Sequence, residues 1–241
     1  MTVGMQDLVS GMQVLWHRQE VLANNLANAS TPGFKRDDLV ILAGRQAPFT
    51  SGNAETVSDV PPMLQWTDFS QGEIRSTGRS LDVAIDGRGF LVVQTARGER
   101  YTRAGALGIN PEGYLITVGG DVVLGEAGPI AVRGGRVTVS PEGQVSDGAR
   151  TVATLKVVDF PRPYRLQKDG AGLFAPAAAS AVPQPAQGHR IVGEALETSN
   201  LNPVETMVTM IEVLRKYEAL QRTVQAVEEA NRQSTGEIGK V

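Results

Sequence analysis

The sequence predicts an α+β protein, with an all-β middle domain of sandwich or barrel type between N- and C-terminal helices that pair as a coiled coil. Apolar residues recur at helical spacings near both ends of the 241-residue chain. Between the ends, short strand-like runs are separated by turn sequences about every ten residues. We therefore expect four segments: residues 1–36 as a coiled-coil helix and turn, 37–80 as an extended linker, 81–192 as the β domain, and 193–241 as the second coiled-coil helix.

The first helix is expected over residues 2–29. Its seam has alternating spacings of three and four that only Gln19 interrupts, and it consists of Met5, Leu8, Met12, Leu15, Leu22 and Leu26. Asn28 is expected to end the helix in the left-handed conformation, and Pro32-Gly33 suits the central positions of a type II turn. Since polar and Pro/Gly-rich chain follows, we expect the seam to pack on the helix at the other end of the chain.

The linker has weaker patterns. Residues 39–42 could form one short strand, and residues 50–56 have the composition of a loop. Trp66 and Phe69 are expected to anchor this otherwise extended segment. We expect it to be poorly ordered until another surface packs on it.

The β domain begins with residues 81–86, where apolar side chains alternate with polar or small ones as in a half-buried strand. One turn sequence occurs twice, first at Asn110-Pro111-Glu112-Gly113 and thirty residues later at Ser140-Pro141-Glu142-Gly143. The Ala/Pro-rich run 175–186 cannot form a central strand and is expected to be a loop or arm.

The C-terminal helix has a clear start signal, with Asn202 as N-cap, Pro203 at the first helical position and Glu205 two positions later. An apolar stripe follows, formed by Val204, Val208, Ile211, Leu214, Tyr217, Leu220, Val224 and Val227. Gly236 is the expected terminator.

Composition excludes several classes of function. A net charge of −3 and a pI near 5.5 give no electrostatic case for nucleic-acid binding. The chain has no cysteine, so disulfides and thiolate metal sites are excluded. No apolar run is long enough for a membrane span, and the N-terminus lacks the pattern of a Sec signal. If the protein leaves the cytoplasm, we expect it to use another route.

No catalytic or cofactor site is predicted. His17 and His189 are isolated from other ligands at metal-binding spacings. Asp82 and Asp86 could act as paired carboxylates, but a solvated strand face explains them more simply. The Gly87–Phe90 run lacks the third glycine and the helix of a dinucleotide fingerprint, so we interpret it as a turn. We expect no cofactor, no metal and no small-molecule substrate.

Four blocks of the sequence resemble, in order, the bacterial flagellar rod and hook proteins. Residues 81–90 and 101–115 are similar to two blocks of the family's β domain, and the C-terminal signature resembles residues 197–218, which include Ser199 and Asn200. The N-terminal signature resembles residues 24–36, through Asn24, Asn25, Leu26, Ala27, Asn28, Ser30, Thr31, Pro32, Gly33 and Phe34.

This resemblance implies a non-catalytic subunit of the bacterial flagellar basal body, which polymerises through its terminal helices into the axial shaft that transmits torque. It implies three kinds of partner: further copies of the chain, other rod proteins, and the flagellar type III export apparatus. The implied location is the rod, in the periplasmic space, reached without a cleaved signal peptide. The helices would form the inner layer around the export channel, with the β domain outside. The length resembles that of a rod protein rather than the larger hook protein, and residues 29–34 favour the proximal-rod type, with the distal-rod type as the alternative.

The predicted assembly interface consists of Leu8, Met12, Leu15, Leu22, Leu26, Val208, Ile211, Leu214, Tyr217 and Val224. A stripe at helical spacing also fits an ordinary core. Linkers separate the β domain from both helices, however, and this favours packing between molecules. From a different class of function, a carbohydrate-active β domain on a helical stalk stays open, with Asp82 and Asp86 as its carboxylates.

Overall fold

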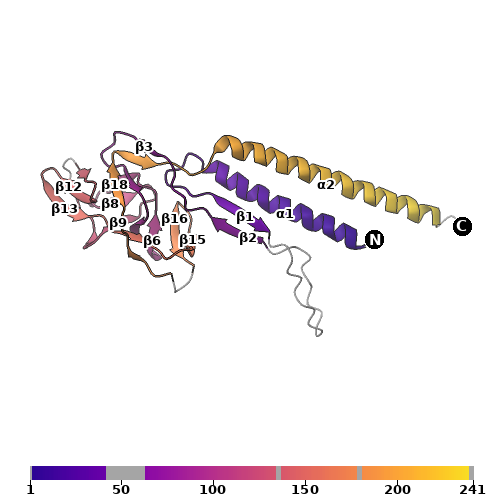
Figure 1. The fold of residues 1–241 in the computed structure, drawn as a ribbon, viewed down its shortest axis with the longest axis horizontal. Coiled ribbons are helices and arrows are strands. Elements are labelled where there is room, and N and C mark those ends of the chain that lie inside the picture. Colours follow the sequence, from indigo (N-terminus) through magenta and orange to yellow (C-terminus); the bar gives the residue numbers. More distant parts are fainter. Residues whose placement is uncertain (1, 42–62, 134–136, 178–180, 239–241) are drawn as a thin grey trace, which may run out of the picture. The chain divides into compact units, whose positions relative to one another are not determined.

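The computed structural model describes residues 2–41, 63–133, 137–177 and 181–238 (Figure 1). They form two compact units. The helical unit contains the described parts of Met1–Ala27, Asp37–Asp68 and Leu201–Val241, and the β body contains those of Asn28–Arg36 and Phe69–Asn200. The α+β class is confirmed, because a helix stands at each end of a mainly β middle region.

The helical unit consists of two long helices and a β-hairpin. The helices are α1 (Thr2–Ala27) and α2 (Pro203–Ile238), and the hairpin pairs β1 (Asp37–Ile41) with β2 (Met63–Thr67). α1 contacts both α2 and β1. The two helices run antiparallel, so the start of α1 and the end of α2 lie at the same end of the pair (Figure 1). They approach closely at Gly11, where an added Cβ would lie 3.5 Å from Cδ1 of Leu220.

α2 begins as predicted but ends later. The side-chain oxygen of Asn202 accepts hydrogen bonds from the backbone N–H groups of Val204 (3.2 Å) and Glu205 (3.4 Å), which confirms the N-cap. The predicted stop at Gly236 is wrong, because the helix continues to Ile238. A single glycine costs a helix only about 1 kcal/mol and does not force its end.

α1 ends at Ala27, two residues before the predicted end. Asn28 is not left-handed, so that prediction is wrong; among the described non-glycine residues, only Ala171 and Glu194 have positive φ. Instead, the N–H of Thr31 donates to the carbonyl of Asn28 at 3.0 Å. The type II turn is confirmed, because the N–H of Phe34 donates to the Thr31 carbonyl at 3.2 Å and Gly33 has a φ of 69°.

The largest sheet of the β body is antiparallel throughout. Its strands are β5 (Phe90–Thr95), β6 (Gly98–Thr102), β7 (Leu107–Ile109), β8 (Leu115–Thr117), β9 (Val122–Gly125), β10 (Gly128–Pro129), β14 (Val157–Asp159), β15 (Leu166–Lys168), β16 (Leu173–Pro176) and β17 (Gln184–Pro185). The main order is β15-β16-β6-β5-β9-β8-β7. β10 pairs with β9, β14 with β5, and β17 with β14.

Three smaller sheets complete the β body. One has the order β11-β12-β13, with bounds Val137–Val139, Gln144–Asp147 and Arg150–Thr154. A second pairs β18 (Arg190–Gly193) with β4 (Val83–Asp86). The third pairs β19 (Ala195–Glu197) with β3 (Ile74–Ser76).

β5 is covered on both faces. Leu91 and Val93 belong to one apolar cluster of the β body, and Phe90 and Val92 belong to the other. Phe69 packs against the second cluster, with its ring centroid 5.1 Å from that of Tyr164 and 5.2 Å from that of Phe174. The expectation that Phe69 acts as an anchor is therefore confirmed.

Several local expectations are wrong. Trp66 is 48% exposed and lies in the helical unit, so it does not anchor the segment in a core as expected. β4 is buried on both faces rather than half-buried, because Ala84 is small enough to be covered as fully as Val83 and Ile85. By contrast, the short strand expected at 39–42 is confirmed within β1, and the described parts of residues 37–80 also hold β2 and β3, each with an antiparallel partner. The Ala/Pro-rich run includes the end of β16 and all of β17, while the loop expected at 50–56 lies outside the described residues.

Candidate functional site

The α2 helix carries two apolar stripes, not one. The inner stripe has spacings of three and four and includes Val213, which is 3% exposed and the most buried apolar side chain of α2. Its other members are partly buried: Met210, Tyr217, Leu220, Val224 and Val227. Because Leu220 lies next to Gly11 of α1, we assign the inner stripe to the contact with α1.

The outer stripe of α2 is open. Its side chains are 43% to 70% exposed, and they are Val204, Met207, Val208, Ile211 and Leu214. Five large apolar side chains on two or three consecutive turns form a larger apolar surface than scattered single residues would. Single exposed apolar residues need no explanation, whereas a contiguous patch indicates a surface that another molecule covers.

The predicted interface residues fall into two groups. Val208, Ile211 and Leu214 lie on the outer stripe, and Tyr217 and Val224 lie on the inner one. All of the predicted α1 residues are partly buried, namely Leu8, Met12, Leu15, Leu22 and Leu26. The sequence pattern merged the two stripes of α2 and omitted Met210 and Val213.

Other parts of the helical unit also expose apolar side chains. On α1 these are Val9 and Trp16, which are seven residues apart and therefore lie on one face of the helix. On the hairpin they are Val40, Ile41, Leu64 and Trp66. Most of the large apolar side chains exposed in the described part of the chain belong to this unit.

Asn25, one of the signature residues, fixes the hairpin to α1. Its side-chain amide donates to the backbone carbonyl of Asp37 at 2.7 Å, and its side-chain oxygen accepts the Asp37 N–H at 2.9 Å. The Asp37 carboxylate in turn accepts from the Thr67 hydroxyl (2.7 Å) and the Gln65 amide (3.0 Å). Asn25 and Asp37 are both buried, so this network replaces the water that these groups would otherwise bind.

Within the β body, the turn after α1 meets the segment before α2. Gly33 donates its N–H to the carbonyl of Glu197 at 2.7 Å. An added Cβ at Gly33 would lie 2.3 Å from the backbone carbon of Arg103, so only glycine fits this position. The Asn200 side chain accepts the Arg36 N–H at 2.9 Å and donates to the Ser70 carbonyl at 3.2 Å.

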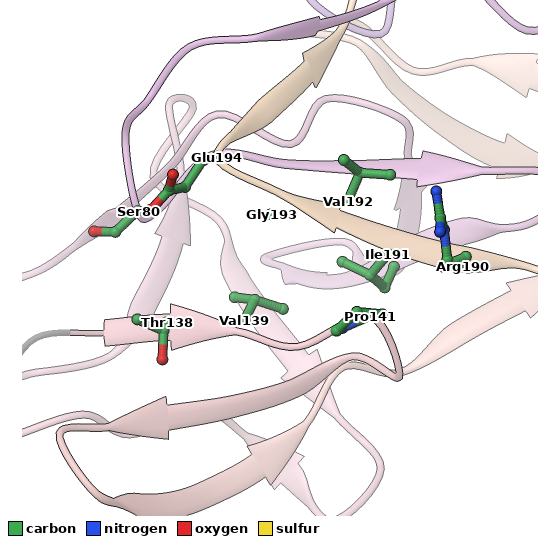
Figure 2. Close-up of a pocket in the computed structure, with 9 residues that line it drawn as sticks. All are labelled: Ser80, Thr138, Val139, Pro141, Arg190, Ile191, Val192, Gly193 and Glu194. Carbon is green, nitrogen blue, oxygen red and sulfur yellow. The ribbon is translucent and has the colours of Figure 1, made fainter.

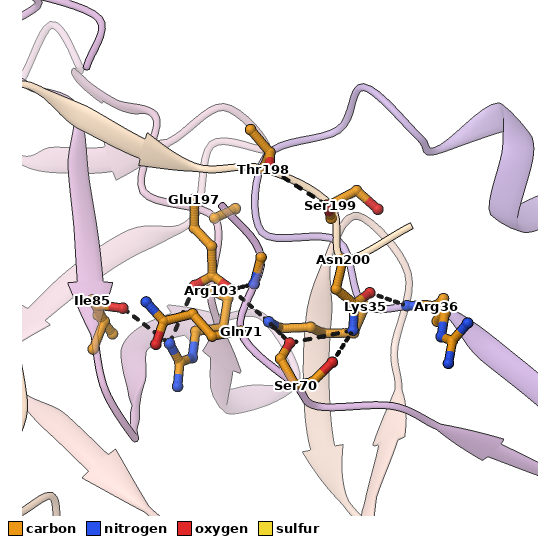
Figure 3. A network of polar contacts seen from close by, with 12 residues as sticks. Lys35, Arg36, Ser70, Gln71, Ile85, Arg103, Glu197, Thr198, Ser199 and Asn200 are labelled. Carbon is orange, nitrogen blue, oxygen red and sulfur yellow. Dashed lines mark hydrogen bonds and ion pairs between the residues drawn. The ribbon is translucent and has the colours of Figure 1, made fainter. Parts of the chain in front are cut away.

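A buried ionic cluster lies at this junction (Figure 3). Glu197 is 0% exposed, and one carboxylate oxygen accepts a 2.5 Å hydrogen bond from the Lys35 ammonium and a 3.0 Å bond from the Gly72 N–H. The other oxygen accepts from the Arg103 guanidinium at 3.2 Å. Lys35 also donates to the Ser70 carbonyl at 2.6 Å. The carboxylate thus has partners on both oxygens, as a buried charge requires.

Arg103 extends the cluster to the start of the large sheet. Its guanidinium donates to the carbonyls of Ile85 (3.2 Å) and Gly87 (2.8 Å) and lies 5.4 Å from the ring centroid of Phe90. The two terminal signatures therefore share one buried polar network inside the β body. Its role is positional, because its charged groups are closed off from solvent.

Sequence reasoning missed Lys35, Arg103 and Glu197 as a set. Lys35 and Glu197 are separated by 162 positions, so no local spacing could have joined them. The sequence signal was weaker: each is a charged residue inside a signature block, and the immediate neighbours of Arg103 and Glu197 are uncharged, although Lys35 is followed by Arg36.

The described residues do not support a catalytic site at the candidates considered. His17 is exposed and pairs with Glu20 at 3.0 Å. Asp82 is 3% exposed and accepts the Thr77 hydroxyl at 2.7 Å, so its assignment to a solvated strand face is wrong. Asp86 is exposed, which leaves the two carboxylates in different environments. In the described ranges, no cluster of three potential metal ligands occurs, and no helix has the length and apolarity to cross a membrane.

A β body that closes its own core and a helical unit that leaves apolar stripes open define a structural assembly subunit. Comparison with known proteins specifies the family of assembly subunit. Three family profiles match: Flagella basal body rod protein over residues 5–35, Flagellar hook protein FlgE/F/G D1 domain over 84–147, and Flagellar basal body rod FlgEFG protein C-terminal over 192–236.

Individual relatives agree. The chain is 36% identical over 237 residues to the flagellar basal-body rod protein FlgF of Caulobacter vibrioides, which covers 97% of this chain and 96% of the relative. It is 37% identical over 228 residues to FlgF of Salmonella typhimurium, covering 88% and 89%. Identity to the flagellar basal-body rod protein FlgG of Bacillus subtilis is 30% over 251 residues, covering 92% and 93%. The chain belongs to the flagellar basal-body rod protein family, whose members are structural proteins and not enzymes, and it is most like FlgF.

Proposed function

We propose that this chain is a structural subunit of the proximal part of the flagellar rod and assembles through its helical unit with copies of itself and with other rod proteins. The observation that carries the proposal is the open outer stripe of α2. The β body buries most of its large apolar residues in two clusters of its own, whereas the outer stripe leaves five large apolar side chains of α2 exposed. The higher identity to FlgF than to FlgG supports the proximal rather than the distal position.

We propose that α1 and α2 pair as a coiled coil and that the outer stripe packs on helices of neighbouring subunits. The inner stripe has the alternating spacings of three and four that a coiled-coil seam needs. A second stripe on the same helix suits a layer in which each helix has neighbours on two sides. Fully burying one Val, Leu or Ile side chain contributes about 1.5–3 kcal/mol, so the five half-exposed residues leave several kcal/mol available to assembly.

The same proposal covers three further features. The β body is a sandwich- or barrel-like domain, which the two-sided burial of β5 supports. By function, the chain divides into an N-terminal helix and turn (1–36), a connecting segment (37–80), a β domain (81–192) and a C-terminal helix (193–241), although residues 28–36 and 193–200 pack within the β body. It reaches the rod, in the periplasmic space, through the flagellar type III export apparatus and without a cleaved signal peptide, as membership of the family supports.

The test replaces Ile211 with aspartate in the full chain and asks whether the variant enters rods. Ile211 is 51% exposed, so the isolated subunit should keep its fold while the interface gains a buried charge. The matched control is Val182→Asp, at a residue of similar exposure (58%) in the β body. We expect Ile211→Asp to be lost from purified basal bodies and to abolish motility, while Val182→Asp assembles. Normal incorporation of Ile211→Asp would refute the proposal.

A further inference from the structure

The β body contains the same turn twice, with the same hydrogen bonds. In the first turn, the Gly113 N–H donates to the Asn110 carbonyl at 2.9 Å, and the Asn110 N–H donates to the Tyr114 carbonyl at 3.0 Å. In the second turn, the Gly143 N–H donates to Ser140 at 2.9 Å, and the Ser140 N–H donates to the Gln144 carbonyl at 2.9 Å.

The match extends beyond the turn itself. The side-chain oxygen of the first turn residue accepts the N–H four positions later in both copies, at 2.7 Å from Asn110 and 3.3 Å from Ser140. The carbonyl of the turn glycine also accepts an N–H from a following segment, at 2.8 Å from Val132 in the first copy and 2.8 Å from Leu155 in the second. β7 and β8 flank the first turn as β11 and β12 flank the second. The hydrogen bonds of the two copies therefore correspond, although the space beside the glycine differs, because an added Cβ at Gly113 would lie 2.8 Å from the Val132 carbonyl oxygen.

In the second copy, β18 covers the outer edge of the turn. The Ile191 N–H donates to the Pro141 carbonyl at 2.9 Å, and an added Cβ at Gly143 would lie 3.5 Å from Cγ1 of Ile191. Two residues along each strand, an added Cβ at Gly193 would lie 3.0 Å from the Val139 carbonyl. β18 thus runs antiparallel to β11, and Figure 2 shows Ile191 beside Pro141 and Val139.

In the first copy, the neighbouring chain covers the edge of the hairpin only before the turn. Asp82 bridges Ala106, and the Val83 N–H donates to the Gly105 carbonyl at 3.0 Å, so the chain before β4 lies along the start of this edge. A turn then takes the chain away, closed by a 3.0 Å bond from the Asp82 N–H to the Arg79 carbonyl.

Beyond Leu107, whose carbonyl accepts a 2.6 Å hydrogen bond from the Arg79 guanidinium, the edge of β7 is open among the described residues. β7 is the terminal strand of its sheet. Asn110 bonds to Tyr114 across the hairpin, so by antiparallel alternation the N–H and C=O of Ile109 point away from β8. Ile109 is 39% exposed and Tyr114 is 38% exposed, and no described strand lies where β18 lies in the second copy.

We propose that the edge from Ile109 to Pro111 is a strand-docking site for an extended segment of a neighbouring axial subunit. The second copy of the turn defines the occupant: an antiparallel strand that donates an N–H to the Pro111 carbonyl, as Ile191 does to Pro141, and packs an apolar side chain on Ile109. Main-chain bonding supplies affinity and the apolar contact supplies specificity, as in other cases of strand addition to a sheet edge. Only the source of the strand rests on the proposed function.

The test uses the full chain and a synthetic peptide of residues 188–194, the segment that covers the second turn. The peptide is titrated while the backbone amide signals of the protein are followed by NMR. We expect saturable shifts at residues 108–114, with an affinity on the order of 1 mM. The variant Ile109→Lys should weaken binding at least about tenfold, which corresponds to about 1.4 kcal/mol. The matched control Val182→Lys should bind as the native chain does.

Three results would overturn the proposal: no binding at several times the expected dissociation constant, shifts confined to residues 138–144, or equal binding by Ile109→Lys. The outcome is separable from that of the rod proposal. If the peptide fails to bind while Ile211→Asp still blocks rod incorporation, the docking site is refuted and the rod function stands.

Discussion

Replacing Lys35 with methionine tests whether the buried ionic cluster holds the two terminal signatures together. Lys35 is 1% exposed and Glu197 is 0% exposed, so the change leaves a carboxylate buried without its shortest partner. Methionine is similar in length and volume, which keeps the cavity term small. The Ser70 carbonyl also loses the ammonium donor.

The expected cost follows from the contacts that remain. Removing one partner of a buried ion pair typically costs about 3–5 kcal/mol. Glu197 would keep Arg103 at 3.2 Å and the Gly72 N–H at 3.0 Å, so we expect the lower end, about 3 kcal/mol. With a urea dependence of about 1–3 kcal/mol per molar, the unfolding midpoint of the β body should fall by at least about 1 M.

Urea unfolding is monitored by hydrogen exchange of the β5 amides. Tryptophan fluorescence would not report on the β body, because both tryptophans, Trp16 and Trp66, belong to the helical unit. The matched control is Arg75→Met, which removes a cation from an exposed pair with Glu73, whose side chains are 69% and 67% exposed. Exposed pairs contribute about 0–1 kcal/mol, so this midpoint should barely move. Equal midpoints for Lys35→Met and Arg75→Met would refute the reasoning.

Two further predictions concern other parts of the chain. Asn25→Ala should cost about 1–3 kcal/mol, because it removes the two hydrogen bonds from the Asn25 side chain to the buried backbone of Asp37, and hydrogen exchange of the β1–β2 hairpin should rise; unchanged protection would contradict the assigned role. Hydrogen bonding from Arg100, ahead of the charges of Arg97 and Arg100, holds the pKa of Asp169 below its ordinary value. The stabilisation is therefore fully present above the unfolded-state pKa of an aspartate and is lost as the pH falls from there through the lower folded-state pKa. Below about pH 4 the urea unfolding midpoint of the native chain should drop toward that of Asp169→Asn; parallel pH profiles would contradict this.

Features with local causes were predictable from the sequence. The N-cap at Asn202 and the type II turn at Pro32-Gly33 each depend on residues within four positions of one another, and both are confirmed. The repeated Pro-Glu-Gly turn is likewise encoded by its own residues and recurs with the same hydrogen bonds at Gly113 and Gly143.

Features that depend on packing between distant segments were not predictable. The spacing of apolar residues on α2 was visible, but only contact with α1 separates Val213, which is covered, from Ile211, which is open. Two stripes on adjacent faces of one helix merge into a single broad pattern in the sequence. The burial of Asp82 and the ion pair between Lys35 and Glu197 depend on where other elements fold. The residue types alone could therefore not predict the burial or the pairing.

The most direct test of the central claim is the position of this subunit along purified basal bodies. The chain lacks cysteine, so a single cysteine on an exposed residue such as Val118 can be labelled with gold and located by electron microscopy. If the chain is a proximal-rod subunit, we expect the label in the rod near its base, below the segment that leads to the hook. Label at the distal end would contradict the proximal assignment, and label absent from rods would contradict the account as a whole.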